Sequence, residues 1–194
     1  MPFTIGIYVY DNVEPLDWAG PYEVLGQWAA ESERDIDVFT IARTDEPVTC
    51  KFGLRVLPDH SIGSVAPLDL LVYPGGDTRG HENDSDLVAW VKAQKERGAL
   101  LTSVCTGAHF YARIGLLSGR PATSWWGSLD RLASTDPTID VRRDERFVDD
   151  GDIVTSAGVS AGIDMALHLV ARLESIERAR SVRRYIQYDP EPPV

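Results

Sequence analysis

The sequence ALLTSVCTGAHF, residues 99–110, predicts a buried strand that runs directly into a helix. Residues 99–104 are apolar or small, which is typical of a strand that is covered on both faces. Cys105 follows at once, and small residues after it allow a sharp turn into a helix from about Thr106 to Ile114. A strand, one turn residue and a helix form a nucleophile elbow, although the G-x-S-x-G sequence of hydrolases is absent. We therefore expect Cys105 at the carboxyl end of a central strand.

Strand-like and helical patterns alternate along the rest of the chain. Strands are predicted over residues 3–10, 36–42, 68–73, 99–104 and 152–156, and helices over 22–30, 86–97, 106–114, 160–173 and 175–186. A turn at Gly53 predicts a hairpin or edge excursion over 48–57, with a short strand at 122–123 and a short helix at 126–132. This alternation predicts an α/β fold: a single-domain three-layer sandwich, with a mostly parallel sheet and helices on both faces. We assign residues 1–188 to this domain and 189–194 to a proline-rich, non-helical tail.

Ligands of such sheets bind beyond the carboxyl ends of the strands, so three predicted loops become candidates: residues 11–20, 74–81 and 104–109. In the first loop, Asp17 could hold a proton between itself and a thiol or pass it to a substrate, and Glu14 is a competing candidate. Both could instead be capping or solvated acids of an acidic protein. Pro74-Gly75-Gly76 supplies flexible backbone that can approach a ligand closely.

Cys105 is the candidate nucleophile. A cysteine at a helix N-terminus lies beside unsatisfied N–H groups, which favour the reactive thiolate and could stabilise negative charge on a substrate. The alternative is a small buried apolar residue, a common state of free cysteines. Cys50 has no comparable context and is interpreted as a bystander. His109, one turn beyond Cys105, is expected to pack or cap, and Trp125 and Trp126 to form pocket wall or core.

The composition excludes several classes of function. The chain has 194 residues, 30 of them acidic and 19 basic, and its net charge of −11 weighs against nucleic acid and anionic membranes as partners. It has no apolar run of the ~20 residues that a membrane span requires, and its N-terminus does not read as a signal peptide. Two cysteines make no disulfide framework, so we expect a cytoplasmic protein with free thiols. Without a metal-ligand cluster, dinucleotide fingerprint or P-loop, no metal and no cofactor are expected, and the expected partner is a small-molecule substrate.

Four segments together resemble the ThiJ/PfpI superfamily, whose fold is flavodoxin-like and is shared with class I glutamine amidotransferases. They are IGIYVYDNVEPLDWAGPYEVL (5–25), LDLLVYPGG (68–76), LLTSVCTGAHFYARIGLLSGRPAT (100–123) and DDGDIVTSAGVSAGIDMALHLV (149–170). They cover nearly the whole predicted domain. Asp17 and Thr106 are similar to the isocyanide hydratase branch, and the terminal YDPEPP (188–193) is similar to one branch of the superfamily. The resemblance also implies a homodimer with its sites near the interface.

The activity that this resemblance implies is cysteine-dependent hydration of isocyanides to N-substituted formamides. Cys105 would attack the terminal carbon of R–N≡C, Asp17 or a water that it holds would deliver a proton, and water would hydrolyse the resulting thioimidate. Thr106 and the backbone N–H of Gly75 or Gly76 would position substrate or water.

One departure from the family pattern is Thr123-Ser-Trp-Trp126, where many relatives have a Thr-Thr-His-Trp type of sequence. Trp125 then replaces a histidine, which argues against histidine-assisted hydrolysis and narrows the expected pocket. Two alternatives stay open: a glyoxalase- or deglycase-like enzyme acting on small aldehydes, and a non-catalytic redox or small-molecule sensor. After residue 173 about twenty residues remain, too few for a DNA-binding helix-turn-helix pair.

Overall fold

The computed structural model describes residues 1–190, and its centre is a seven-stranded sheet in the order β10-β11-β7-β6-β1-β2-β5. The strands are β1 (Phe3–Tyr8), β2 (Ile36–Ala42), β5 (His60–Ser61), β6 (Leu70–Tyr73), β7 (Leu100–Val104), β10 (Phe147–Asp149) and β11 (Ile153–Ser156). Neighbouring strands run parallel except for the edge pair β10 and β11, which is antiparallel. The prediction of a mostly parallel sheet is confirmed.

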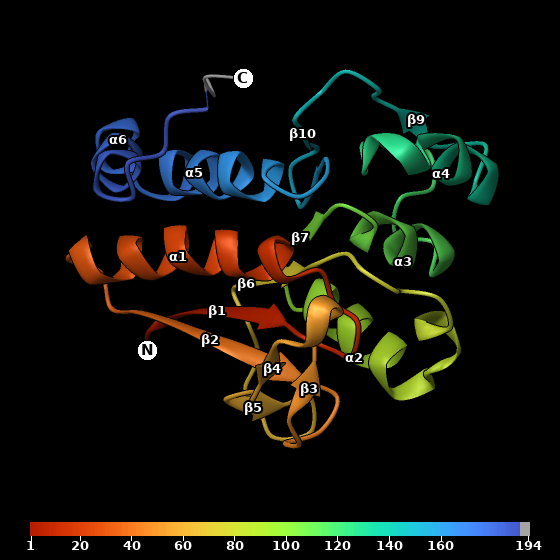
Figure 1. Cartoon of the computed structure of the whole chain (residues 1–194), viewed down its shortest axis with the longest axis horizontal. Helices are drawn as coiled ribbons and strands as arrows, with labels where there is room; N and C mark the ends of the chain where they lie inside the picture. Colours follow the sequence, from red (N-terminus) through yellow and green to blue (C-terminus); the bar gives the residue numbers. More distant parts are fainter. Residues whose placement is uncertain (191–194) are drawn as a thin grey trace.

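Helices cover both faces of this sheet, because its central strands are apolar on both sides. Every residue of β6 and β7 is buried. One core cluster joins the sheet to α1 (Pro15–Glu31), α5 (Ala161–Leu173) and α6 (Ile176–Tyr185). The other joins it to α2 (Ser85–Glu96), α3 (Gly107–Arg113) and α4 (Leu129–Thr135). Helices α1 and α5 run side by side (Figure 1), and the predicted three-layer sandwich is confirmed.

Helix α1 begins seven residues earlier than the sequence predicts, so the assignment of residues 15–20 to a loop is wrong. Pro15 occupies the first helical position, where a backbone N–H would have no partner within the helix. Pro21 lies inside the helix and is buried. It packs against α5, since a Cβ atom on Gly162 would lie 3.2 Å from its Cγ. As a result, Asp17 lies in the first turn of a helix and not in a loop.

Short elements complete the fold. The predicted hairpin is present as β3 (Val48–Thr49) and β4 (Arg55–Val56), with a 3₁₀ turn η1 (Lys51–Gly53) between them. The predicted strand at 122–123 corresponds to β8 (Pro121–Ala122), which pairs in parallel with β9 (Asp140–Val141) outside the central sheet. Two further 3₁₀ turns are η2 (His81–Asn83) and η3 (Trp126–Ser128). The prediction of a non-helical tail falls largely on residues 191–194, which lie outside the described residues.

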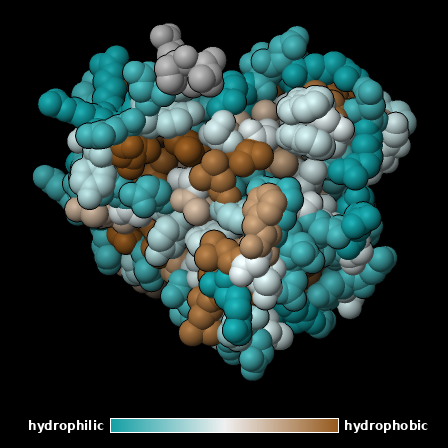
Figure 2. Space-filling model, viewed as in Figure 1, coloured by the Kyte–Doolittle hydropathy of each residue, from teal (hydrophilic) through white to brown (hydrophobic). Residues whose placement is uncertain are grey.

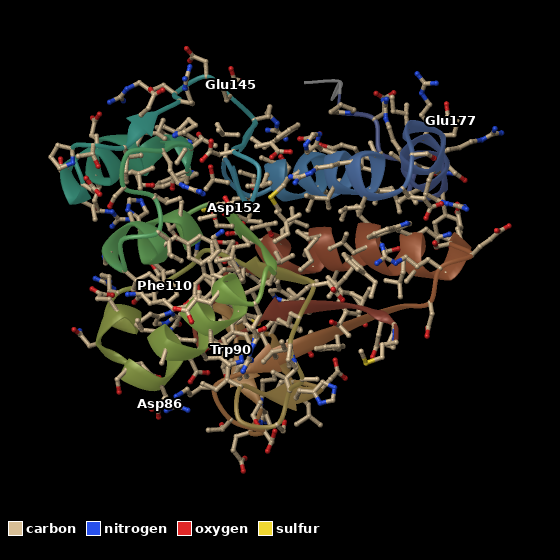
Figure 3. The ribbon with its side chains drawn as sticks, turned by 180° about the vertical axis from the view of Figure 1, so that it is seen from behind. Asp86, Trp90, Phe110, Glu145, Asp152 and Glu177 are labelled. Carbon is tan, nitrogen blue, oxygen red and sulfur yellow. The ribbon has the colours of Figure 1, made fainter. Side chains whose placement is uncertain are left out.

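An aromatic layer holds the strand ends against α2 and α3. The Tyr73 ring stacks on Phe110 of α3 at 4.6 Å and on Tyr8 of β1 at 5.1 Å between centroids. Trp90 of α2 packs on Tyr8 from the same side, and Figure 3 shows Phe110 and Trp90 from behind. Such stacked aromatic contacts are rigid, and they place the start of α3 relative to the ends of β1 and β6. Within residues 1–190, no helix has the length and apolarity needed to cross a bilayer.

Candidate active site

Cys105 forms the predicted elbow between β7 and α3. Its φ angle is 56°, in the left-handed region that residues with a side chain rarely adopt. The surroundings hold this conformation: the Cys105 N–H donates to the carbonyl oxygens of Ser156 and Ala157 at 3.1 Å, and its own carbonyl accepts from Ser124 Oγ at 2.7 Å. Gly107 permits the turn, because a Cβ atom there would lie 2.3 Å from the Tyr73 carbonyl oxygen. Strain retained at a site in this way is typical of functional positions.

Asp17 is the buried acid of the site. Its carboxyl group is fully buried, and Oδ2 accepts the Gly75 N–H at 2.9 Å. Its other oxygen, Oδ1, is also buried and has no partner of ordinary hydrogen-bond geometry within residues 1–190. Burial raises the pKa of Asp17 to about 7, although the Gly75 N–H and the Cys105 thiol act to lower it. Asp17 therefore exchanges its proton near neutral pH.

The Cys105 thiol does not ionise as readily as the sequence predicts. Burial, and then the negative charge of Asp17, raise its pKa to about 12. The backbone N–H groups of Thr106 and Val159 act in the opposite direction, but burial outweighs them. The expected backbone N–H groups do favour the thiolate, but they do not offset burial beside a carboxylate, so the net effect is a raised thiol pKa. Above about pH 7, Asp17 and Cys105 instead hold one proton between them.

The hydrogen-bond donors that the sequence analysis expects to face the substrate are bonded to other groups of the protein. The Gly75 N–H donates to Asp17, and the Gly76 N–H donates to Thr106 Oγ1 at 2.9 Å. Thr106 Oγ1 in turn donates to the Gly76 carbonyl oxygen at 2.9 Å. The prediction that these N–H groups and the Thr106 hydroxyl position substrate or water is therefore not supported, since their partners are within the protein. Their contacts lock the 74–76 loop onto the elbow.

Gly75 is required by close packing rather than by flexibility. A Cβ atom at this position would lie 2.6 Å from Thr106 N and 2.7 Å from Asp17 Oδ2. The absence of a side chain lets the loop, the elbow and the Asp17 carboxyl meet. Val159, which the sequence analysis missed, supplies the remaining N–H group that favours the thiolate. It follows β11 at the same edge of the sheet, and its φ of 35° is again in the left-handed region.

A cavity of about 770 Å³ opens beside Cys105. Its walls come from the three rim loops, η1, the residue before η3, α4 and the segment after β11: Asn12, Glu14, Lys51, Gly76, Asp77, Thr78, Arg79, Cys105, Thr106, Trp125, Arg131 and Val159. Trp125 lines it and packs on Gly158, where a Cβ atom would lie 2.3 Å from Trp125 Cδ1. Trp126 is not among the residues that line the cavity, and its side chain is 77% exposed. The prediction that it forms pocket wall or core is therefore wrong.

The remaining candidates lie apart from the nucleophile or have other partners. Glu14 lines the cavity but is paired with Lys51, at 2.7 Å from Oε2 to Nζ. His109 is buried and bonded through Nε2 to Ser128 Oγ at 3.0 Å, and burial lowers its pKa to about 4, which confirms a packing role. Cys50 is buried in the core cluster on the α2 side and is a free thiol. Among residues 1–190, no three His, Cys, Asp or Glu side chains are grouped as metal ligands.

The fold and this elbow define a class of protein, and sequence comparison identifies it. The sequence profile of the DJ-1/PfpI family matches residues 4–172, so the chain belongs to that family. Over 194 residues it is 34% identical to an isonitrile hydratase from Pseudomonas putida, covering 100% of this chain and 82% of that protein.

Other relatives have different names. The chain is 27% identical to the HTH-type transcriptional regulator GbdR of Pseudomonas aeruginosa, covering 97% of this chain but 51% of the regulator. Among solved structures, a ThiJ/PfpI family protein from Pseudomonas syringae matches with a TM-score of 0.88 and 30% identity, over 100% of this chain and 78% of that one. DJ-1beta of Drosophila melanogaster, at 23% identity, matches in fold with a TM-score of 0.84, over 97% and 100% of the two chains. The family thus includes proteins named as enzymes and proteins named as regulators.

Proposed function

We propose that the protein hydrates isocyanides to N-substituted formamides, with Cys105 as the nucleophile and Asp17 as the acid and base. The single observation that carries the proposal is the buried Asp17–Cys105 pair, which exchanges a proton near neutral pH at the wall of an open cavity. The similarity to an isonitrile hydratase, isonitrile being another word for isocyanide, supports the choice of substrate. None of the cavity-lining residues within 1–190 is a histidine, and the lining acids Glu14 and Asp77 are paired with Lys51 and Arg79. We therefore assign the proton transfer to Asp17, whose carboxyl group interacts with the Cys105 thiol.

In the first step, the proton shared by the pair moves to Asp17 as the Cys105 sulfur bonds to the terminal carbon of R–N≡C. Asp17 then gives that proton to the same carbon. The product is a thioimidate, R–N=CH–S–Cys105, and Asp17 is left as a carboxylate. The N–H groups of Thr106 and Val159, which favour the thiolate, stabilise the sulfur while it carries negative charge.

In the second step, the Asp17 carboxylate takes a proton from water while the water oxygen bonds to the thioimidate carbon. Asp17 passes that proton to the nitrogen. The C–S bond then breaks as the hydroxyl of the adduct becomes the formamide carbonyl, and the hydroxyl proton returns to the sulfur. The formamide R–NH–CHO leaves, and the pair again holds one proton. The formamide contains the atoms of one isocyanide and one water, so the reaction consumes no external oxidant or cofactor.

The other site residues have positioning roles in this proposal. Gly75 aims the Asp17 carboxyl through its N–H. Thr106 fixes the loop through its two bonds to Gly76 and presents its own N–H to the sulfur. Trp125, packed on Gly158, forms the wall against which the R group of the isocyanide lies.

We also propose that the protein is a homodimer that acts on a small molecule in the reducing cytoplasm. Two free cysteines suit such a compartment. Apolar surface lies over α1 and α5 and around β3 and β4 (Figure 2), and exposed apolar side chains there include Leu16 (41%) and Phe52 (82%). The charge of −11 disfavours DNA as a ligand. Sedimentation at micromolar concentration distinguishes a dimer from a monomer of 21.4 kDa.

Formamide production from a small panel of alkyl and aryl isocyanides tests the function. We expect turnover by the wild type, and none above background by C105A or D17N. Substitution of the bystander thiol in C50A is the matched control and is expected to retain turnover. A folded wild type that turns over no member of the panel contradicts the proposal, and conversion of methylglyoxal to lactate by the same preparation would favour the glyoxalase alternative.

A further inference from the structure

Three basic side chains line the cavity beside Cys105, and two of them are already neutralised. Lys51 Nζ lies 2.7 Å from Glu14 Oε2. Arg79 forms a two-point contact with Asp77, at 2.7 Å from Nε and 2.6 Å from Nη2. Because each base and its acid both line the cavity, these two pairs add no net charge to its walls.

Arg131 of α4 is the third base, and it has no such partner. Within residues 1–190, its guanidinium makes no ion pair and no hydrogen bond, although its side chain is exposed at the cavity wall. Its positive charge reaches the base of the elbow helix, where it contributes to lowering the pKa of the buried His109. Of the charged side chains that line the cavity, Arg131 is therefore the one that lacks an ionic partner within residues 1–190.

We propose that Arg131 binds a carboxylate group of the substrate, so that the preferred isocyanides carry a carboxylate at the end remote from the isocyanide carbon. The isocyanide part of this inference rests on the proposed function; the anion site itself does not. A guanidinium matches a carboxylate with two parallel hydrogen bonds. The cavity of about 770 Å³ has room for a ligand that spans from Cys105 to Arg131.

The other two bases are poorer candidates for this contact. A carboxylate that approached Lys51 or Arg79 would have to compete with Glu14 or with the two-point contact of Asp77. Arg131 can bind a carboxylate without first giving up an ion pair. The carboxylate also replaces only water at Arg131, because the guanidinium is exposed.

The experiment compares pairs of substrates that differ only in charge: 3-isocyanopropanoate and its amide, and 4-(isocyanomethyl)benzoate and its amide. The measured quantity is the ratio of kcat/KM for the anion to that for the amide. We expect a ratio of about two to five in the wild type, the range that an exposed ion pair supplies, and a fall toward one in R131Q. R131K should retain part of the ratio, and 1 M salt should reduce it.

The matched control is R97Q. Arg97 is also exposed and without an ion pair in the described chain, but it lies at the end of α2 outside the cavity. R97Q should keep the wild-type ratio. A wild-type ratio of one, or a ratio that persists in R131Q, would overturn the assignment.

A second measurement separates this inference from the proposed function. Iodoacetyl-β-alanine and its amide alkylate Cys105 whether or not the protein hydrates isocyanides, and mass spectrometry gives the rate at each cysteine. A preference for the anion that R131Q abolishes supports the anion site even if no isocyanide is turned over, in which case only the proposed function fails. Equal rates for both reagents in the wild type count against the site.

Discussion

The N–H of Gly75 donates a hydrogen bond of 2.9 Å to Oδ2 of Asp17, and this contact joins the loop after β6 to the first turn of α1. It orients a fully buried carboxyl group beside the Cys105 thiol. Both residues are distant from Cys105 in the sequence, and the fold brings them next to it. The predictions below concern this contact, the proton that the pair shares and the covalent chemistry that follows.

G75A should disturb the pair. Its Cβ atom would lie 2.7 Å from Asp17 Oδ2 and 2.6 Å from Thr106 N, so the carboxyl and the elbow must separate. We expect a loss of about 1–3 kcal/mol in the free energy of unfolding, together with slower alkylation of Cys105 at pH 8. Denaturant titration and mass spectrometry measure the two effects. The control is G26A in α1, the helix that carries Asp17, where a Cβ atom meets nothing within 4 Å; it should gain about 0.5–1 kcal/mol, and a G75A variant that matched it would contradict this packing.

D17N should be more stable than the wild type at neutral pH. Burial raises the pKa of Asp17 from 3.8 to about 7, so between these values the folded protein binds more protons than the unfolded chain. The wild type therefore loses stability as the pH rises through that window, by up to about 4 kcal/mol. An amide keeps the acceptor for the Gly75 N–H and has no such dependence. Urea titrations at pH 4 and pH 8 should show nearly equal stability at the lower pH and an advantage for D17N at the higher one.

The reactivity of Cys105 should follow the titration of the pair. In the wild type, alkylation by iodoacetamide should rise with pH around a midpoint near 7, because loss of the first proton lets Asp17 accept the thiol proton. D17N cannot accept it, and burial still raises the thiol pKa above its ordinary value of 9.0. Its alkylation at pH 8 should therefore fall at least about tenfold. Coincident pH profiles for the two proteins would show that the proton is not shared.

Thr106 should matter through its hydroxyl, which satisfies both backbone groups of Gly76. T106V leaves that N–H and carbonyl without their partner, and we expect a loss of about 1–3 kcal/mol in the free energy of unfolding. T106S keeps the hydroxyl and should lose much less. Thermal unfolding followed by circular dichroism compares the two variants, and equal losses would assign the effect to the methyl group instead.

Local patterns in the sequence predict the sheet and the elbow, because both depend on short apolar runs and small residues. The apolar run of residues 99–104 becomes β7, and the single turn residue Cys105 follows it. The start of α1 is missed because prolines indicate loops locally, whereas Pro15 fits the first helical position and Pro21 is accommodated against Gly162.

The chemical state of the site depends on contacts that no local pattern contains. The occupied N–H groups of Gly75 and Gly76 result from partners 58 and 30 residues away. The raised pKa of Cys105 results from burial and from the Asp17 charge, which only the packed structure brings together. Arg131 gave no sequence signal, since its lack of a carboxylate partner is a property of the folded cavity.

Capture of the covalent intermediate tests the central claim most directly. Wild-type protein is mixed with benzyl isocyanide, quenched in acid within milliseconds to seconds and digested for mass spectrometry. We predict a peptide containing Cys105 whose mass has increased by one whole isocyanide, because the thioimidate retains both the isocyanide and the thiol proton, and this adduct should decay as N-benzylformamide appears. Formamide formed at the wild-type rate by C105A, or formed by the wild type with an adduct only on Cys50, would contradict the account.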